Sequence, residues 1–321
     1  MLRFGIIGTG IISTRHIKAL EKNEGAQLVA VVDIDKEKAQ MAADLCESKV
    51  SVYTDYKEML GKEVLDAVII NLPHYLHEET TVACAEKRIH VLVEKPMSVS
   101  VESCKRMIQV CEKNQVVLQI GHVQSYFPEN KKAKELILSG KLGKLLMIQD
   151  IRTSFYFPPT RPHWFLEKQR SGGGILMNLG AHSLDKIKFL TESSFEEVSG
   201  KCGFEQPGCE VEGNAQLFLR TKNGVTASIT LCGYHDIPVN ETTIYLTGGV
   251  LKLKTGTGLE IWKDGSFQKV VDSDTQMPFD VQLDDFVESI LNGSVPFTNG
   301  TYSMEIISAI EEVYRKTGGY H

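Results

Sequence analysis

Short apolar runs alternate with longer amphipathic segments through the first third of the chain. Strands are expected at 2–7, 28–32, 50–53, 67–70, 91–93 and 116–120. Segments with helical spacing separate them, at about 13–22, 36–46, 55–60, 78–87 and 101–114. Strands that alternate with helices form right-handed βαβ units around a parallel sheet. The pattern therefore predicts a doubly wound α/β domain of the Rossmann type over residues 1–121.

The remaining two thirds of the chain follow a different pattern. After a helix expected at about 129–139, strands follow one another with turn residues rather than helices between most of them. These strands are expected at 145–153, 196–204, 213–220, 225–231, 243–246, 250–254 and 259–262, and two helices at 281–291 and 303–316 finish the chain. Consecutive strands favour an antiparallel sheet. We therefore expect an α+β domain over 122–321.

Composition narrows the class of protein. A hydrophobic content of 42% with 24% charged residues is ordinary for a globular protein with a real core. The net charge of −6 argues against a nucleic-acid or anionic-membrane partner. No apolar run approaches the ~18 residues of a membrane span, and the N-terminus enters a strand at once, so no signal peptide is expected. Seven cysteines without a Cys-x-x-Cys pair indicate reduced thiols and a cytoplasmic location.

A glycine-rich turn links the first strand to the first helix. It has the form Gly-x-Gly-x-x-Ser, in which glycines let the backbone approach a pyrophosphate and the helix N-terminus offers free N–H groups. Asp33 ends the second strand about 20 residues further on, where a carboxylate can bind a ribose 2′-hydroxyl. An acid there repels a 2′-phosphate, so NAD is expected rather than NADP. The candidate cofactor residues are Gly8, Thr9, Gly10, Ile11, Ile12 and Asp33.

Two further loops follow strands of the same sheet. Glu94-Lys95-Pro96 ends the strand at 91–93, and the proline restricts Lys95 to extended geometry at the sheet edge where ligands bind. The loop after the strand at 67–70 reaches the same edge, and His77 is expected to order it. Metal binding is not expected, because no nearby acid or cysteine completes a ligand set with His74 and His77. Leu72, Pro73, His77, Glu94 and Lys95 join the candidate cofactor residues, and Lys95 is also a catalytic candidate.

One helix in the second part carries polar residues on one face. Asn178 and His182 are four residues apart, behind the glycine run 172–174 that would let a ligand come close. A histidine beside an amide can serve acid–base chemistry, although the same pattern fits a helix whose polar residues face water. Asp185, one turn on, and Trp164, as an apolar wall for a sugar ring or as a core residue, are candidate substrate contacts.

With these motifs in place, the chain resembles the Gfo/Idh/MocA family, named for glucose–fructose oxidoreductase and inositol dehydrogenase. The resemblance rests on the Gly8-x-Gly10 turn with Asp33, on His77, on Glu94-Lys95-Pro96, and on the glycine run leading to Asn178-x-Gly180-x-His182. It implies a Rossmann domain followed by a domain with a large open, mostly antiparallel sheet. It also implies a nicotinamide cofactor, catalytic positions at Lys95 and His182, and homodimers or homotetramers built through that sheet.

The chain departs from the family pattern at two places. Asn178 stands where the family often has aspartate, so the amide cannot relay a proton to His182 as a carboxylate could. We expect Asn178 to orient a substrate oxygen and to leave His182 as the proton carrier. In segment 121–128, Gln124 and Ser125 stand where many members have arginine. Contacts to the cofactor or the substrate would differ there.

The resemblance implies a nicotinamide-dependent oxidoreductase that transfers a hydride between NAD and a secondary alcohol or carbonyl of a sugar, polyol or sugar derivative. His182 would exchange the proton while Lys95 donates a hydrogen bond to the reacting oxygen. Two alternatives stay open. One is a non-catalytic NAD-binding sensor or regulator, and the other is a reductase of a larger, non-sugar carbonyl compound. The loops 155–170 and 234–240 would set the substrate, whose identity the sequence does not give.

Overall fold

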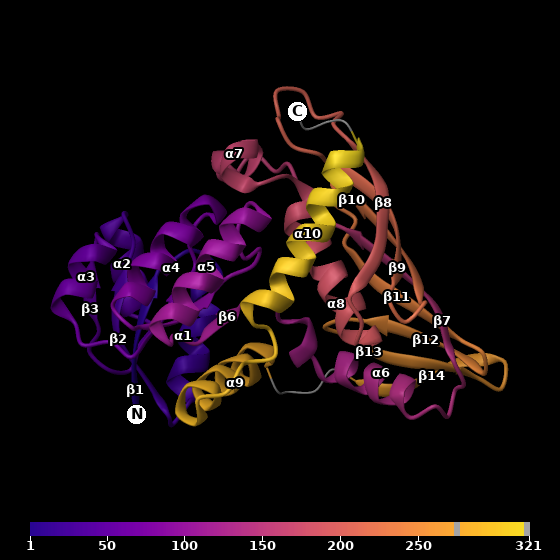
Figure 1. Ribbon diagram of the computed structural model, residues 1–321, viewed down its shortest axis with the longest axis horizontal. Helices are drawn as coiled ribbons and strands as arrows, with labels where there is room; N and C mark the ends of the chain where they lie inside the picture. The colour runs from indigo at the N-terminus through magenta and orange to yellow at the C-terminus, as the bar shows by residue number, and fades with distance from the viewer. Residues whose placement is uncertain (273–276, 318–321) are drawn as a thin grey trace. The chain divides into compact units, whose positions relative to one another are not determined.

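The computed structural model describes residues 1–272 and 277–317, and these form two units (Figure 1). The first unit comprises Met1–Gly121 and Met277–Met304, and the second comprises the described parts of His122–Gln276 and Glu305–His321. The sequence analysis expected one uninterrupted second domain over 122–321, whereas in the structure part of that range belongs to the first unit. The segment Met277–Met304 returns to the first unit, because its helix packs on the core of that unit.

The first unit is built on a six-stranded parallel sheet. Its strands are β1 (Leu2–Ile7), β2 (Ala26–Val32), β3 (Ser51–Tyr53), β4 (Ala67–Ile70), β5 (His90–Val93) and β6 (Leu118–Ile120). Its helices include α1 (Ser13–Lys22), α2 (Lys36–Ala43), α3 (Tyr56–Lys62), the short η1 (His74–Leu76), α4 (His77–Glu86) and α5 (Val101–Asn114). The strand order β3-β2-β1-β4-β5-β6 is that of a Rossmann sheet and confirms this part of the predicted fold class. Every residue of β4 is buried, as expected for a central parallel strand.

Helix α9 (Pro278–Asn292) completes the core of the first unit and lies beside α1 (Figure 1). Phe286 meets Phe4 of β1 edge to face, with ring centroids 6.1 Å apart. At the end of α1, Lys22 Nζ lies 2.8 Å from a carboxylate oxygen of Asp280. This helix therefore covers apolar surface that the N-terminal segment cannot cover by itself.

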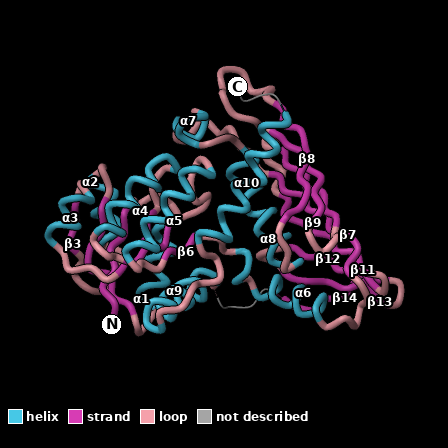
Figure 2. The backbone as a smooth tube through the Cα atoms, viewed as in Figure 1, coloured by secondary structure: helices cyan, strands magenta, loops and turns pink. Residues whose placement is uncertain are grey.

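The second unit is built on an eight-stranded sheet (Figure 2). Its strands are β7 (Leu145–Thr153), β8 (Phe195–Gly203), β9 (Asn214–Thr221), β10 (Thr226–Cys232), β11 (Val239–Leu246), β12 (Gly249–Lys254), β13 (Gly258–Lys263) and β14 (Ser266–Asp272). The order is β14-β13-β12-β11-β7-β10-β9-β8, and every pair is antiparallel except β7 with β10. The large, mostly antiparallel sheet is thus confirmed. Strand β14 was not expected, because its sequence has no sustained apolar run.

Helices cover one face of this sheet. The elements outside the sheet include η2 (Gln124–Tyr126), α6 (Pro128–Leu138), η3 (His163–Leu166), α7 (Lys168–Ser171), the π-helical turn η4 (Leu176–Gly180) and α8 (Ala181–Thr191). The last helix, α10 (Gly300–Thr317), begins in the first unit and ends in the second. Helix α8 packs against β7 and α6, and α6 packs against β12, β13 and β14. The covered face is lined by the buried alternate residues of the strands, such as Ile148, Leu217, Ile244 and Leu251.

A buried lysine anchors α8 to the sheet. Nζ of Lys186 lies 3.0 Å from Asp150 Oδ1, 3.1 Å from Asn240 Oδ1 and 2.8 Å from Thr242 Oγ1. Three acceptors match the three N–H bonds of an ammonium group. Burial lowers the pKa of Lys186, and the charge of Asp150 opposes that shift. This network fixes the orientation of Asn240 and of the helix that begins just after Asn178.

Candidate functional site

The ends of four parallel strands bring the predicted cofactor residues to one edge of the first sheet. Strands β1 and β4 are neighbours although they are distant in sequence, so the winding of the sheet reverses between them. Ligands of doubly wound sheets bind in the crevice at such a switch point. Gly8, Asp33, Asn71 and Glu94 each follow a strand directly, and Glu94 N donates to Ile70 O at 2.9 Å.

The two glycines of the first loop are required for different reasons. Gly8 has φ of +94°, and a Cβ there would lie 2.7 Å from the carbonyl oxygen of Asn71. The protein's own backbone therefore requires glycine at this position. No atom lies within 4 Å of a Cβ placed on Gly10, whose φ is not in the left-handed region. Packing within the described residues does not explain Gly10, whereas the close approach of a phosphate would.

The start of α1 suits an anion. No side chain caps it at Ile12 and its first turn has no acidic residue, so backbone N–H groups remain for a ligand. The hydroxyl of Ser13 donates to Gly10 O at 2.6 Å and holds the loop closed. Ile11 is 95% exposed, an apolar side chain that a bound dinucleotide would partly cover. These residues fit a pyrophosphate.

Asp33 is held in place by the same loop. One carboxylate oxygen accepts hydrogen bonds from the N–H and the hydroxyl of Thr9, both at 2.9 Å. The other oxygen accepts the N–H of Asp35 at 3.0 Å. A carboxylate has about four acceptor positions, so capacity remains for a ribose hydroxyl. Ile34 beside it is 95% exposed and offers an apolar surface that the sequence analysis did not identify.

Glu94 is a buried carboxylate that connects the dinucleotide loop to Lys95. Its Oε1 lies 2.9 Å from Nε2 of His16, a buried residue of α1, and its Oε2 accepts the N–H of Lys95 at 3.1 Å. Burial raises the pKa of Glu94, but the hydrogen bond and charge of His16 and the charge of Lys95 outweigh it, so the net shift is downward. Glu94 is therefore ionised. His16 was missed, although a polar residue among the apolar positions of α1 was a signal.

His77 ties two loops together. Its Nε2 lies 2.8 Å from Leu72 O, and its Nδ1 lies 3.0 Å from Pro96 O. Burial lowers the pKa of His77, and the carbonyls of Leu72 and Pro96 oppose that shift. A neutral ring has one N–H and so donates to one of these two carbonyls at a time. The ring is completely buried, which confirms that it orders the turn but corrects the direct cofactor contact expected for it. Leu72 and Pro73, on the loop that it holds, are left to make such a contact.

The glycine run of the second unit has a packing role. A Cβ on Gly173 would collide with the hydroxyl of Tyr314, and one on Gly174 would collide with the backbone of Glu212. The Glu212 carboxylate accepts the N–H of Gly174 at 2.8 Å and the hydroxyl of Tyr314 at 2.8 Å. The run therefore admits the protein's own groups, and not a ligand as the sequence analysis expected.

Asn178 and His182 follow that run and are both half-buried. Asn178 lies in η4, a π-helical turn of the kind found often at functional sites. Its amide opposes the upward shift that burial gives the pKa of Tyr156. The guanidinium of Arg161 lies 4.1 Å from the centroid of the Tyr156 ring. The tyrosine and the arginine, from the loop after β7, were not identified from sequence.

The two other candidate substrate contacts, Trp164 and Asp185, occupy different environments. Trp164 is half-buried in η3 and stacks on Phe165 with ring centroids 3.7 Å apart, so an apolar wall is present there. Asp185 is completely buried, and its carboxylate lies 3.7 Å from His122 Nδ1 and accepts the N–H of Gln124 at 3.3 Å. It therefore holds the segment that begins the second unit. This corrects the direct substrate contact expected for Asp185.

Neither a metal cluster nor a membrane span is found within residues 1–272 and 277–317. No three His, Cys, Asp or Glu side chains gather there closely enough to hold a metal ion. The ring centroids of His74 and His77 are 5.9 Å apart, but the His77 nitrogens face backbone carbonyls. Every helix in the same residues is too short or too polar to cross a bilayer.

Known proteins are similar to this chain in sequence and in structure. A relative from Mediterraneibacter gnavus, named 2,7-anhydro-N-acetylneuraminate hydratase, is 32% identical over 196 residues, which is 61% of this chain and 51% of the relative. An oxidoreductase from Streptococcus pneumoniae is 29% identical with 53% of its length covered, so the chain spans about half of these curated relatives. A D-xylose 1-dehydrogenase from Haloarcula marismortui is 24% identical and aligns with 98% of this chain and 90% of its own.

Solved structures share the fold over nearly the whole chain. Aldose-aldose oxidoreductase from Caulobacter crescentus superposes with a TM-score of 0.90 at 24% identity, covering 99% of this chain and 97% of its own. An oxidoreductase from Agrobacterium radiobacter gives 0.87 at 18% identity, covering 99% and 96%. The family model "Oxidoreductase family, NAD-binding Rossmann fold" matches residues 2–122, and "GFO/IDH/MocA C-terminal domain" matches 130–252. The chain therefore belongs to the Gfo/Idh/MocA family of NAD(P)-dependent oxidoreductases.

Proposed function

We propose that this protein transfers a hydride between NAD and a secondary alcohol or carbonyl of a sugar, polyol or sugar derivative. One observation carries the proposal: the loop that fits a pyrophosphate and the loop that bears Lys95 are locked together through His16 and Glu94, 2.9 Å apart. A bound nicotinamide supplies the hydride acceptor in oxidation and the donor in reduction. D-xylose 1-dehydrogenase and inositol 2-dehydrogenase are among the relatives and lend support to this substrate class.

Three side chains take the remaining chemical roles. His182 accepts the hydroxyl proton during oxidation and returns it during reduction. Lys95 donates a hydrogen bond to the same oxygen, where negative charge develops. Asn178 orients the substrate oxygen through its amide, which has one acceptor oxygen and two N–H donors. The proposal assigns Lys95 of the first unit and His182 of the second to one reaction on the chemistry of these side chains and on their positions in the family pattern.

A second candidate function comes from the relatives. Two of them, from Mediterraneibacter gnavus and Escherichia coli, are named hydratases. A hydratase adds water and leaves no net change in the nicotinamide, whereas a dehydrogenase forms one NADH for each product. The stoichiometry of NADH to product therefore separates the two functions. Turnover of any substrate separates the dehydrogenase and the hydratase from a non-catalytic sensor. Turnover of a sugar or polyol separates these two enzymes from a reductase of non-sugar carbonyl compounds.

The first prediction concerns Gly10. Gly10→Ala meets no protein atom but enters the space for the pyrophosphate, so we expect unchanged stability and weaker NADH binding by ~1.4 kcal/mol or more, a tenfold rise in Kd. Calorimetric titration with NADH and thermal unfolding measure the two quantities. Gly61→Ala, in α3, is the control: it also meets no atom within 4 Å and should leave NADH affinity unchanged. Equal NADH affinity in wild type and Gly10→Ala would place the dinucleotide elsewhere.

The second prediction concerns cofactor choice. We expect NADH to bind more tightly than NADPH, because the Asp33 carboxylate would repel a 2′-phosphate. Asp33→Ser removes that charge and should narrow the difference between the two dissociation constants. Titration of both reduced cofactors into both proteins provides the measurement. Tighter NADPH binding by the wild type contradicts the assignment.

The third prediction concerns catalysis. Lys95→Met and His182→Ala should retain NADH binding and lower turnover by roughly 10²–10⁴, the usual range for acid–base assistance. Absorbance of reduced nicotinamide across a panel of sugars and polyols finds the substrate, after which both variants are compared with the wild type. Melting temperature with and without NADH controls for folding. A variant that turns over at the wild-type rate identifies a structural residue.

The fourth prediction concerns assembly. We propose a homodimer or homotetramer built through the uncovered face of the second sheet, which presents Met147, 47% exposed, and Phe218, 57% exposed. Apolar side chains that gather on an exposed sheet face favour association. The double variant Met147→Glu with Phe218→Glu should lower the mass measured by light scattering to that of one chain. A wild type of monomer mass, or a variant with unchanged mass, rules out this face.

A further inference from the structure

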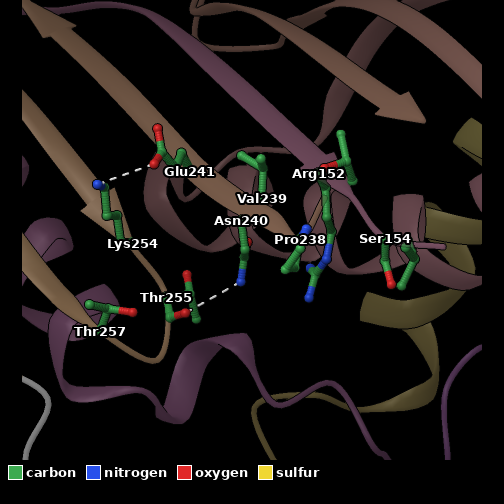
Figure 3. A pocket seen from close by; sticks show the side chains of 11 residues that line it. Arg152, Ser154, Pro238, Val239, Asn240, Glu241, Lys254, Thr255 and Thr257 are labelled. Atoms are coloured by element: carbon green, nitrogen blue, oxygen red, sulfur yellow. Dashed lines mark hydrogen bonds and ion pairs between the residues drawn. The ribbon is translucent and has the colours of Figure 1, made fainter. Parts of the chain in front are cut away.

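The second unit contains a cavity of about 400 Å³ where β7 ends and β11 begins (Figure 3). Its lining includes Arg152, Ser154, Leu179, Pro238, Asn240 and Thr255. Leu179 is adjacent to Asn178 and precedes His182 by less than one helical turn. The cavity thus adjoins the helical segment to which we assign proton transfer.

Arg152 brings a cation into this cavity. It lies two residues after Asp150 on β7 and pairs in register with Asn240 on β11, so it faces the helix-covered side of the sheet. A guanidinium has five N–H donors, and its NH1 nitrogen is buried without a hydrogen-bond acceptor among the described residues. Arg152 is half-buried, and a buried N–H group without an acceptor is costly, so this nitrogen is suited to an acceptor that comes from outside the chain.

The other polar groups of the cavity reinforce a preference for acceptors. Lysine can only donate, so the bond from Lys186 Nζ to Asn240 Oδ1 at 3.1 Å fixes which end of that amide is oxygen. The amide NH₂ of Asn240 therefore points toward Thr255 and donates a hydrogen bond to its carbonyl oxygen at 3.4 Å. In Figure 3 the amide nitrogen of Asn240 and the guanidinium of Arg152 extend to the same side of the strands.

Two acidic side chains near the cavity form ion pairs with lysines and not with Arg152. Asp150 lies 3.0 Å from Lys186 Nζ, and Glu241 lies 3.2 Å from Lys254 Nζ. Burial lowers the pKa of Arg152, although the charges of Asp150 and Asp185 oppose the shift. An anion placed against the guanidinium would remove part of the cost of burying it.

We infer that this cavity receives a carboxylate of the substrate, with Arg152 as its counter-ion, so that the substrate is an acidic sugar or polyol such as a uronic or aldonic acid. The inference rests on the proposed function for its statement that the ligand is the substrate. The planar fork of arginine matches the two oxygens of a carboxylate, and Asn240 provides a further donor.

The test compares sugars that differ only at carbon 6. D-glucose, D-glucuronate and D-glucose 6-phosphate form one set, and D-galactose, D-galacturonate and D-galactose 6-phosphate form another. Each is titrated by calorimetry into the NADH-loaded protein. In at least one set we expect the uronate to bind roughly tenfold to a hundredfold more tightly than the neutral sugar and more tightly than the phosphate, as for a charged hydrogen bond.

Variants assign this preference to one residue. Arg152→Leu should abolish the advantage of the uronate, and Arg152→Lys, which keeps the charge without the fork, should retain part of it. Lys201→Leu is the matched control, since it removes the same charge from an exposed position on β8 and Lys201 does not line the cavity. It should keep the full advantage. Melting temperature and NADH affinity verify that each variant is folded.

Three results would overturn the inference. The wild type could bind neither uronate more tightly than its neutral sugar, which includes a wild type that binds no uronate at all. It could prefer the phosphates to the uronates, or the Arg152→Leu protein could keep the advantage of the uronate. Because binding is measured as heat, no turnover is needed. A uronate preference that depends on Arg152 in a protein without turnover would leave the carboxylate pocket standing and overturn the proposed dehydrogenase function.

Discussion

The buried carboxylate of Glu94 is the constraint on which the cofactor half of the molecule depends. A charge removed from water must be balanced by close partners, and breaking such a pair costs about 3–5 kcal/mol. Here the partners are His16, on the helix that follows the glycine loop, and the backbone N–H of Lys95. The position of Lys95 therefore depends on α1, the helix whose N-terminus we assign to the phosphates of the cofactor. A conformational change that moved one would leave Glu94 without its balance.

A second buried charge has the same effect in the other unit. Lys186 uses all three N–H bonds on Asp150, Thr242 and Asn240, and so fixes α8 on the sheet. Glu212 does the same for the entry to this helix, because it accepts backbone N–H groups from Gly174 and Leu176. The half-buried Asn178 and His182 lie between these two anchors. In both units hydrogen bonds from a buried ion hold the backbone next to a residue to which we assign a role in catalysis.

The sequence predicted what depends on local pattern. Apolar runs are long enough in β4 and β5 to identify strands, and their alternation with helices identified the Rossmann sheet. It could not assign Met277–Met304 to the first unit, because an amphipathic helix shows that it has an apolar face but not which core that face meets. It also misread Gly173 and Gly174, since their partners Glu212 and Tyr314 are far away in the chain. Arg152 was one polar residue within a strand until the register placed Asn240 beside it.

The return of α9 to the first unit has a consequence for biosynthesis. A ribosome releases the chain from the N-terminus, and domains usually fold as they emerge. Here the surface around Phe4 and α1 stays uncovered until Phe286 has left the exit tunnel, and the strands of the second sheet, which all precede Phe286 in the chain, leave the tunnel before it. The nascent Rossmann sheet must therefore wait with exposed apolar surface, a state that recruits chaperones. A fragment cut at Gly121 would carry the same exposed surface permanently.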